Sequence, residues 1–153
     1  MKFLIVDDDG VCRERLRDIL APYGSCEFAR NGAEAIGAVR RALRRGEPYS
    51  LICLDIMMPE ASGHEALEAI RRIEAEHGIL GLDGTKVIMT TSLRESKHCV
   101  QAFREGCESY VVKPVEAEQL LGRMRELGLL PASPAAPQQP PAQPSPQPHA
   151  CAR

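Results

Sequence analysis

Four aspartates stand directly behind two short apolar runs. Asp7, Asp8 and Asp9 follow the run at the start of the chain, and Asp55 follows Leu51–Leu54. Two unit charges ~4 Å apart repel by about 4 kcal/mol at an effective dielectric constant near 20, so neighbouring carboxylates all stay ionised only beside a cation. Hard oxygen ligands of this kind suit Mg²⁺, which binds a few carboxylates and keeps several waters. If the fold brings these aspartates together, they predict a magnesium site.

A lysine and a threonine follow two further apolar runs. Lys113 comes directly after Ser109–Val112, and Thr91 ends the run Val87–Thr91. Lys113 would place a positive charge on the other side of Asp55 from the metal ion. An ionised carboxylate between two cations is a nucleophile matched to an incoming phosphoryl group, because the cations neutralise the charge on its oxygens. Thr91 adds a hydroxyl donor to the same oxygens.

Some of these acids have a purely structural alternative. An acid just before a helix commonly accepts a hydrogen bond from the first backbone amides, and Asp9 is the best candidate for such a cap. Asp7 and Asp8, taken alone, would also fit a cap or a solvated loop. A shared site is favoured by the joint placement of five groups, namely Asp7, Asp8, Asp55, Thr91 and Lys113.

Residues 1–130 alternate short apolar runs with segments of helical periodicity. Most runs are continuous, as in parallel strands that are buried on both faces. The predicted strands are Phe3–Val6, Cys26–Ala29, Leu51–Leu54, Val87–Thr91 and Ser109–Val112. The predicted helical stripes are Cys12/Leu16/Ile19/Leu20, Ala35/Val39/Leu43, Leu67/Ile70/Ile73, Cys99/Val100/Phe103 and Leu120/Leu121/Met124/Leu127, with stops at Gly24, Gly46, Gly106 and Gly128. A strand–helix unit repeated five times predicts a doubly wound α/β fold, whose ligand site lies beyond the carboxyl ends of the strands.

Composition narrows the partners and the compartment. The chain has 19 Lys and Arg against 21 Asp and Glu, which gives no reason to expect nucleic acid. No apolar run approaches the ~20 residues that span a bilayer, and the N-terminus lacks signal-peptide features. We therefore expect a cytoplasmic protein without a membrane partner. The six cysteines include no C-x-x-C pair, so we expect reduced thiols and no zinc site.

Residues 131–153 differ sharply from the rest of the chain. They hold eight of the twelve prolines and no Leu, Ile, Val or Phe. Such a stretch cannot bury enough apolar surface to offset its ordering entropy, so we predict a Pro/Ala/Gln-rich disordered tail. Its two P-x-x-P spacings suit either a proline-reading partner or a plain solvated extension.

Four blocks of sequence resemble the receiver domain of bacterial two-component response regulators, most closely the stand-alone, chemotaxis-type (CheY-like) members. The blocks are Phe3–Asp9, Leu54–Pro59, Val87–Ser92 and Tyr110–Pro114. All four in this order are very specific, and they cover Met1 to about Leu130. The resemblance implies a five-stranded parallel sheet of flavodoxin type with strand order 2-1-3-4-5.

The resemblance also implies a phosphoacceptor and its metal ligands. Asp55 receives a phosphoryl group from a phosphohistidine on a sensor histidine kinase or a histidine phosphotransfer protein. Asp8 binds Mg²⁺ directly and Asp7 binds it mainly through water. Asp55 and the backbone carbonyl of Met57 complete the protein ligands.

The remaining implied roles concern the phosphoryl oxygens and the output. Thr91 and Lys113 bind these oxygens, and Tyr110 turns inward when Thr91 moves toward them. A downstream protein docks on the fourth helix, fifth strand and fifth helix, roughly residues 94–127. Ser92 stands where the family commonly has Ala. Serine is still small, so we expect the phosphoryl group to keep its access to the site.

Two further features complete the expectations. Met57 and Leu93, two residues past Asp55 and Thr91, cannot orient or deprotonate a water, so we predict a long-lived phosphorylated form. Residues 77–86 make a long connection, either a surface loop with a turn or a partner contact.

Three alternatives stay open at this point. A phosphorylation-independent scaffold would share the fold. A magnesium-dependent aspartyl-phosphate phosphohydrolase usually needs a second acid where Met57 stands. A nucleotide or flavin binder needs a phosphate-cradling loop where the aspartates stand.

Overall fold

The computed structural model describes residues 1–92 and 106–131, and within them five parallel strands form one sheet in the order β2-β1-β3-β4-β5. The strands are β1 (Lys2–Val6), β2 (Ser25–Ala29), β3 (Leu51–Asp55), β4 (Lys86–Thr91) and β5 (Ser109–Val112). The helices are α1 (Gly10–Leu20), α2 (Gly32–Arg44), α3 (Gly63–Glu76) and α5 (Ala117–Glu126), with short 3-10 turns η1 (Ala21–Tyr23) and η2 (Gly81–Asp83). The predicted fold class and strand order are confirmed. The predicted fourth stripe, Cys99/Val100/Phe103, lies outside the described residues, as do residues 132–153.

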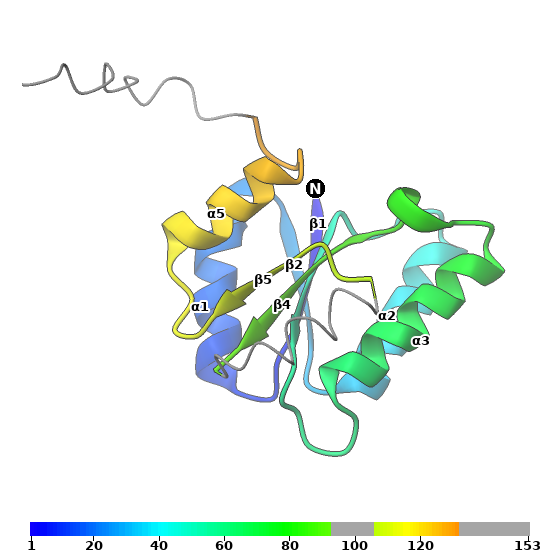
Figure 1. Ribbon diagram of the computed structural model, residues 1–153, viewed down its shortest axis with the longest axis horizontal. Helices are drawn as coiled ribbons and strands as arrows, with labels where there is room; N and C mark the ends of the chain where they lie inside the picture. The colour runs from blue at the N-terminus through cyan, green and yellow to red at the C-terminus, as the bar shows by residue number, and fades with distance from the viewer. Residues whose placement is uncertain (93–105, 132–153) are drawn as a thin grey trace, which may run out of the picture.

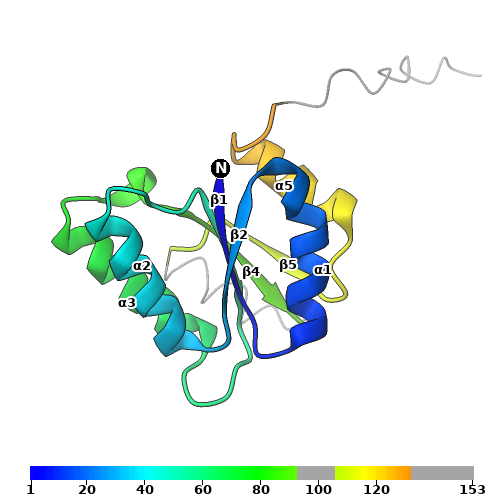
Figure 2. The same cartoon turned by 180° about the vertical axis from the view of Figure 1, so that it is seen from behind.

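Helices cover both faces of the sheet. Figures 1 and 2 show α1 and α5 against one face and α2 and α3 against the other. Alternate strand residues supply the two core layers, because successive side chains of a strand point to opposite faces. The layer under α1 and α5 includes Phe3, Ile5, Leu16, Leu20, Leu120 and Met124, and the layer under α2 and α3 includes Leu4, Val6, Ala35, Val39, Leu67 and Ile70. Burial on both faces explains why the strands read as continuous apolar runs.

Polar side chains start three of the helices. Asp9 caps α1 by accepting from the N–H of Val11, as the sequence predicted. Asn31 caps α2, and Ser62 caps α3. Each cap satisfies a backbone donor that the first turn of a helix leaves unpaired. The caps fix where each helix begins after a strand, and so they fix the length of the loops that carry the site.

Gly24 departs from its predicted role. We expected it to stop the first helix, but α1 already ends at Leu20 and continues as η1. The backbone of Gly24 is extended, with φ 170°, and a Cβ there would lie 2.2 Å from the carbonyl oxygen of Met1. Glycine is needed because β2 passes so close to the start of β1. Gly46 and Gly128 do follow α2 and α5 with positive φ, as predicted.

The connection 77–86 is more than a plain surface loop. It contains η2 and then turns inward at Gly84, which is buried. A Cβ on Gly84 would lie 2.2 Å from Glu74 Oε2 and 2.8 Å from Arg71 Nη1. The loop is therefore packed onto the C-terminal half of α3 before β4 begins.

Two statements follow for the described part of the chain. Its cysteines Cys12, Cys26, Cys53 and Cys107 are free thiols. Among the helices of residues 1–92 and 106–131, none combines the length and apolar character required to cross a bilayer.

Candidate functional site

The carboxyl ends of β1 and β3 bring three aspartates together at one edge of the sheet. Asp7 follows β1 directly and Asp55 is the last residue of β3, and the two strands are neighbours. One carboxylate oxygen from each of Asp7, Asp8 and Asp55 lies within 4.8 Å of the others. Asp7 is 0% and Asp55 is 3% exposed, whereas Asp8 is open to solvent. The predicted acidic cluster therefore has two buried members and one exposed member.

Lys113 lies between the two buried aspartates. Its Nζ is 2.8 Å from Asp7 Oδ2 and 3.2 Å from Asp55 Oδ2. Its backbone N–H donates to the Thr91 carbonyl at 2.7 Å, which fixes the end of β5 beside the end of β4. We expected Lys113 beside Asp55, on the other side from the metal ion, and made no prediction about Asp7. The structure has it shared, because one ammonium group relieves the repulsion between two carboxylates best when it contacts both.

Backbone amides orient both buried carboxylates. The N–H of Asp9 donates to Asp7 Oδ1 at 2.9 Å, and the N–H of Met57 donates to Asp55 Oδ1 at 3.1 Å. In each aspartate the loop after the strand holds Oδ1, while Oδ2 faces Lys113. The fold thus sets the orientation of the carboxylates without a ligand.

The surroundings of the site shift two pKa values. Burial and the charge of Asp7 raise the pKa of Asp55 to about 6, and Lys113 partly opposes the rise. Burial acts to lower the pKa of Lys113, but its hydrogen bond to Asp7 and the charges of both aspartates outweigh burial, so that pKa is raised. Lys113 is therefore an ammonium group, and Asp55 loses its proton close to neutral pH. A further cation at the cluster would favour ionised Asp55.

Thr91 meets Lys113 at the site, whereas Tyr110 lies further back along β5. Thr91 ends β4, is fully buried, and is in register with Val112. Tyr110 stands opposite Met89 in the ladder, is partly buried, and packs against the core layer under α2 and α3. Thr91 therefore lies at the carboxyl end of the sheet with the aspartates, and Tyr110 lies two residues further from that end on the neighbouring strand.

The loop after Asp55 packs tightly against it at Gly63. A Cβ on Gly63 would lie 2.2 Å from the carbonyl oxygen of Asp55, and the N–H of Gly63 donates to the Ile56 carbonyl at 2.9 Å. Sequence reasoning did not single out Gly63. Its position directly after the cap Ser62 was the available signal. The side chain of Met57, in the same loop, is 56% exposed.

Two arginines of α1 hold the frame of the site and were not predicted. Arg13 Nη1 donates to the main-chain carbonyl of Asp7 at 2.7 Å. Arg15 Nε donates to the carbonyl of Val115 at 2.6 Å, two residues after Lys113. Both arginines bind main-chain oxygens. Every residue has a main-chain carbonyl, so residue types in the sequence do not predict such a contact.

The donor set fits Mg²⁺. Carboxylate oxygens are the hard ligands that this ion prefers, and an exposed member leaves room for the waters it keeps. The three aspartates carry three negative charges, of which Lys113 balances one, so two remain for a divalent cation. Asp7, Asp8 and Asp55 are therefore the residues that would hold the ion.

Comparison with known proteins decides the family. The model of the response regulator receiver domain matches residues 3–125. The chain belongs to this family. Receiver domains are signalling switches of two-component systems that bind Mg²⁺ at an acidic pocket and interact with histidine kinases and downstream effectors.

Curated relatives agree with this membership. The receiver domain is 35% identical over 127 residues to the transcriptional regulatory protein ResD of Bacillus subtilis. This match covers 82% of this chain and 47% of ResD. It is 30% identical over 122 residues to the chemotaxis protein CheY of the same organism, and this match covers 78% of this chain and 91% of CheY. The chain spans about half the length of ResD and of the DltR regulators of Streptococcus agalactiae that it also matches.

Solved structures of receiver domains superpose well. The receiver domain of the histidine kinase CKI1 from Arabidopsis thaliana, complexed with Mg²⁺ and BeF₃⁻, gives a TM-score of 0.72 at 25% identity, over 83% of this chain and 89% of that one. Vibrio cholerae CheY4 gives a TM-score of 0.69 at 25% identity, over 82% and 97%.

Proposed function

We propose that Asp55 of this receiver domain is a phosphoacceptor. The main support is the Asp55 carboxylate itself, which is 3% exposed, lies in the acidic cluster, and is 3.2 Å from Lys113 Nζ. A buried carboxylate next to an ammonium group and a set of hard oxygen ligands is suited to attack phosphorus.

The phosphoryl donor is a phosphohistidine of a sensor histidine kinase or a histidine phosphotransfer protein. A carboxylate oxygen of Asp55 forms the new P–O bond while the P–N bond to the histidine breaks. The bonding pair stays on the imidazole nitrogen, which then takes a proton from water. The product is an acyl phosphate that carries about two negative charges.

Each neighbour of Asp55 has a role in this transfer. When bound, Mg²⁺ supplies positive charge to the phosphoryl oxygens. Asp7 and Asp8 would hold the ion, together with Asp55 and the backbone carbonyl of Met57. Lys113 contacts the phosphoryl oxygens from the protein side. The Thr91 hydroxyl donates a charge-assisted hydrogen bond to them.

The output depends on Thr91 and Tyr110. When Thr91 moves toward the phosphoryl group, it vacates space that the Tyr110 ring fills. The surface of residues 94–127 then differs between the two states, and a protein partner that prefers one state shifts the equilibrium. Residues 93–105 of this surface lie outside the described residues, so the output face and the tail 131–153 stay predictions from sequence.

The deciding experiment is phosphorylation by a small acyl-phosphate donor with Mg²⁺, followed by intact mass. Transfer of one phosphoryl group to Asp55, with release of the carboxylate of the donor, adds one phosphate. Asp55→Asn should abolish the gain, whereas Asp18→Asn, at an acid whose side chain is 75% exposed on α1, should leave it unchanged. A chain that gains no phosphate, or an Asp55→Asn variant that still gains it, would refute the proposal. Repeated turnover of the donor without a stable adduct would favour a phosphohydrolase.

A further inference from the structure

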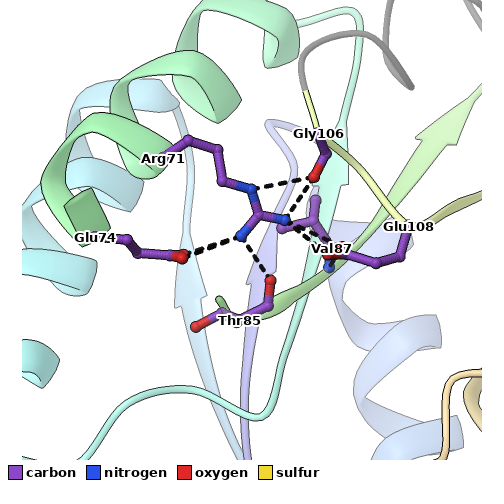
Figure 3. A network of polar contacts seen from close by, with 6 residues as sticks. All are labelled: Arg71, Glu74, Thr85, Val87, Gly106 and Glu108. Carbon is purple, nitrogen blue, oxygen red and sulfur yellow. Dashed lines mark hydrogen bonds and ion pairs between the residues drawn. The ribbon is translucent and has the colours of Figure 1, made fainter. Parts of the chain in front are cut away.

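Arg71, in the last turns of α3, cross-links three segments at the amino-terminal edge of the sheet. Figure 3 shows its guanidinium among two carboxylates and two main-chain carbonyls. Nε and Nη2 donate to the Gly106 carbonyl at 3.1 and 2.6 Å, and Nη1 donates to the Thr85 carbonyl at 2.8 Å. Nη1 also contacts Glu74 at 3.0 Å, and Nη2 contacts Glu108 at 3.0 Å. These contacts engage all three guanidinium nitrogens.

The cluster is largely removed from solvent. The side chain of Arg71 is 20% exposed, and those of Glu74 and Glu108 are 3% and 15% exposed. A planar fork of five donors suits this arrangement, because it satisfies several acceptors in fixed directions at once. A buried arginine with so many partners is a rigid junction rather than a surface ion pair.

Glu108 passes this rigidity on to the sheet. Its carboxylate accepts from the N–H of Val87 at 2.6 Å, and its own N–H donates to the Val87 carbonyl at 3.0 Å. Glu108 therefore brackets Val87, with one hydrogen bond to its N–H and one to its carbonyl. These two bonds are the first contacts between the segments that continue as β4 and β5. The ladder then runs from Ile88 opposite Ser109 to Thr91 opposite Val112.

The far end of the same ladder carries the phosphoryl-binding pair. Val87 is four residues before Thr91, and Glu108 is five residues before Lys113, a span of about 16 Å along the strand. The proposed magnesium ligands instead lie at the ends of β1 and β3: Asp7 and Asp8 are in the loop after β1, and Asp55 is the last residue of β3. Arg71 thus holds the segments that lead into β4 and β5, the strands that end at Thr91 and just before Lys113, and its hydrogen bonds go to these segments and to Glu74.

We infer that Arg71 is a positioning residue for phosphoryl transfer, acting through Glu108 and Val87 on the register of β4 and β5. This inference rests on the proposed function of Asp55. Without Arg71, the buried carboxylates of Glu74 and Glu108 repel each other, and the bracket around Val87 loosens. Thr91 and Lys113 then lose their alignment with Asp55, while the three aspartates stay at the carboxyl ends of the paired strands β1 and β3.

The test uses the full chain with three variants. Arg71→Gln removes the charge and the fork. Arg71→Lys keeps a positive charge beside both carboxylates, so it protects folding, but its single nitrogen cannot bridge both carbonyls. Arg72→Gln is the matched control, since Arg72 is the next residue of α3, its side chain is 71% exposed, and its distance to Glu68 is 3.9 Å.

Three readouts separate positioning from a general loss of stability. These are the rate of Asp55 phosphorylation at saturating donor and Mg²⁺, the Mg²⁺ affinity by titration, and amide hydrogen exchange in β5, all per folded molecule. We expect both Arg71 variants to phosphorylate roughly tenfold more slowly, within the ~100-fold that a 1 Å misplacement can cost. Exchange in β5 should be faster, and Mg²⁺ affinity should not fall. Arg72→Gln should match the wild type in all three readouts.

Several results would overturn the inference. Phosphorylation of Arg71→Lys and Arg71→Gln at the control rate would refute it. A joint fall of the phosphorylation rate and the Mg²⁺ affinity would also refute it, because it would mark a purely structural residue. Unchanged exchange in β5 would remove the proposed route. If the wild type and Arg72→Gln accept no phosphate at all, the proposed function of Asp55 fails first, and the assignment of Arg71 fails with it.

Discussion

Replacing Asp55 by Asn should stabilise the metal-free protein at pH 8, although it removes one partner of a buried ion pair. Burial and the neighbouring Asp7 raise the pKa of Asp55 to about 6, against the pull of Lys113. In an unfolded chain an aspartate titrates near 3.9, so ionisation costs the folded state about two pKa units, or about 3 kcal/mol at most. Asn removes this cost and leaves Lys113 paired one to one with Asp7, 2.8 Å away.

The pH dependence gives the sign of the effect. Because the folded pKa of Asp55 is raised, its ionisation penalty is absent below the unfolded value near pH 4. The penalty grows between pH 4 and 6 and is complete above the folded value of about 6. The stability gain from Asp55→Asn should therefore be largest at pH 8, about 3 kcal/mol, and below about 1 kcal/mol near pH 4.

Urea unfolding in the presence of a chelator measures both values. Asp18→Asn, at an exposed acid of α1, is the control and should change stability little at either pH. Adding Mg²⁺ should stabilise the wild type more than Asp55→Asn, because a ligand that binds the folded state stabilises it by an amount that increases with the logarithm of its affinity. An Asp55→Asn variant that is no more stable than the wild type at pH 8, or whose gain is the same at both pH values, would refute the charge argument.

Three further substitutions have defined outcomes. Met57→Asn supplies a group that orients water beside Asp55, so the acyl phosphate should decay on the order of tenfold faster by intact mass, and equal or slower decay would contradict this. Gly63→Ala should lower the unfolding free energy by about 2 kcal/mol or more, because the added Cβ would clash with the Asp55 carbonyl. The control Gly122→Ala on α5, where a Cβ meets nothing within 4 Å, should raise the unfolding free energy by up to about 1 kcal/mol. Equal effects of the two substitutions would contradict the packing argument. Lys113→Gln should raise the pH of half-maximal phosphorylation, because Asp55 loses its cation; an unchanged midpoint would count against that role.

The acidic cluster could be predicted from the sequence because, in a parallel sheet, the residues that follow each strand lie at the same edge of the sheet. Asp7, Asp55 and Lys113 each follow an apolar run, and in a parallel sheet every run ends at the same edge. The buried strands were visible as continuous apolar runs, so the strands of the sheet agreed with the expected ranges to within one residue at each end. Position along a strand was therefore enough to predict which side chains share a pocket.

Geometry finer than strand order was not available from the sequence. Whether Lys113 flanks Asp55 alone or lies between Asp7 and Asp55 depends on the path of the chain after β5, which periodicity does not describe. Gly24 looked like a helix stop because it follows a helical stripe. The structural reason for glycine is the nearby carbonyl of Met1, a contact distant in sequence that periodicity does not reveal. Arg71 looked like its exposed neighbour in α3, because hydrogen bonds to main-chain carbonyls leave no signature in residue types.

The two ends of the sheet use similar ingredients for opposite purposes. At the carboxyl end, one ammonium group lies between two of three clustered aspartates, so two negative charges stay uncompensated and the third acid faces solvent. At the amino end, two glutamates surround one guanidinium, whose donors also reach two main-chain carbonyls. A cluster that is short of positive charge and open to solvent can gain a cation and a phosphoryl group. A cluster whose donors are already engaged holds its shape instead. In the switch proposed above, such a fixed end would confine the response to Thr91 and Tyr110 and leave the rest of the sheet in place.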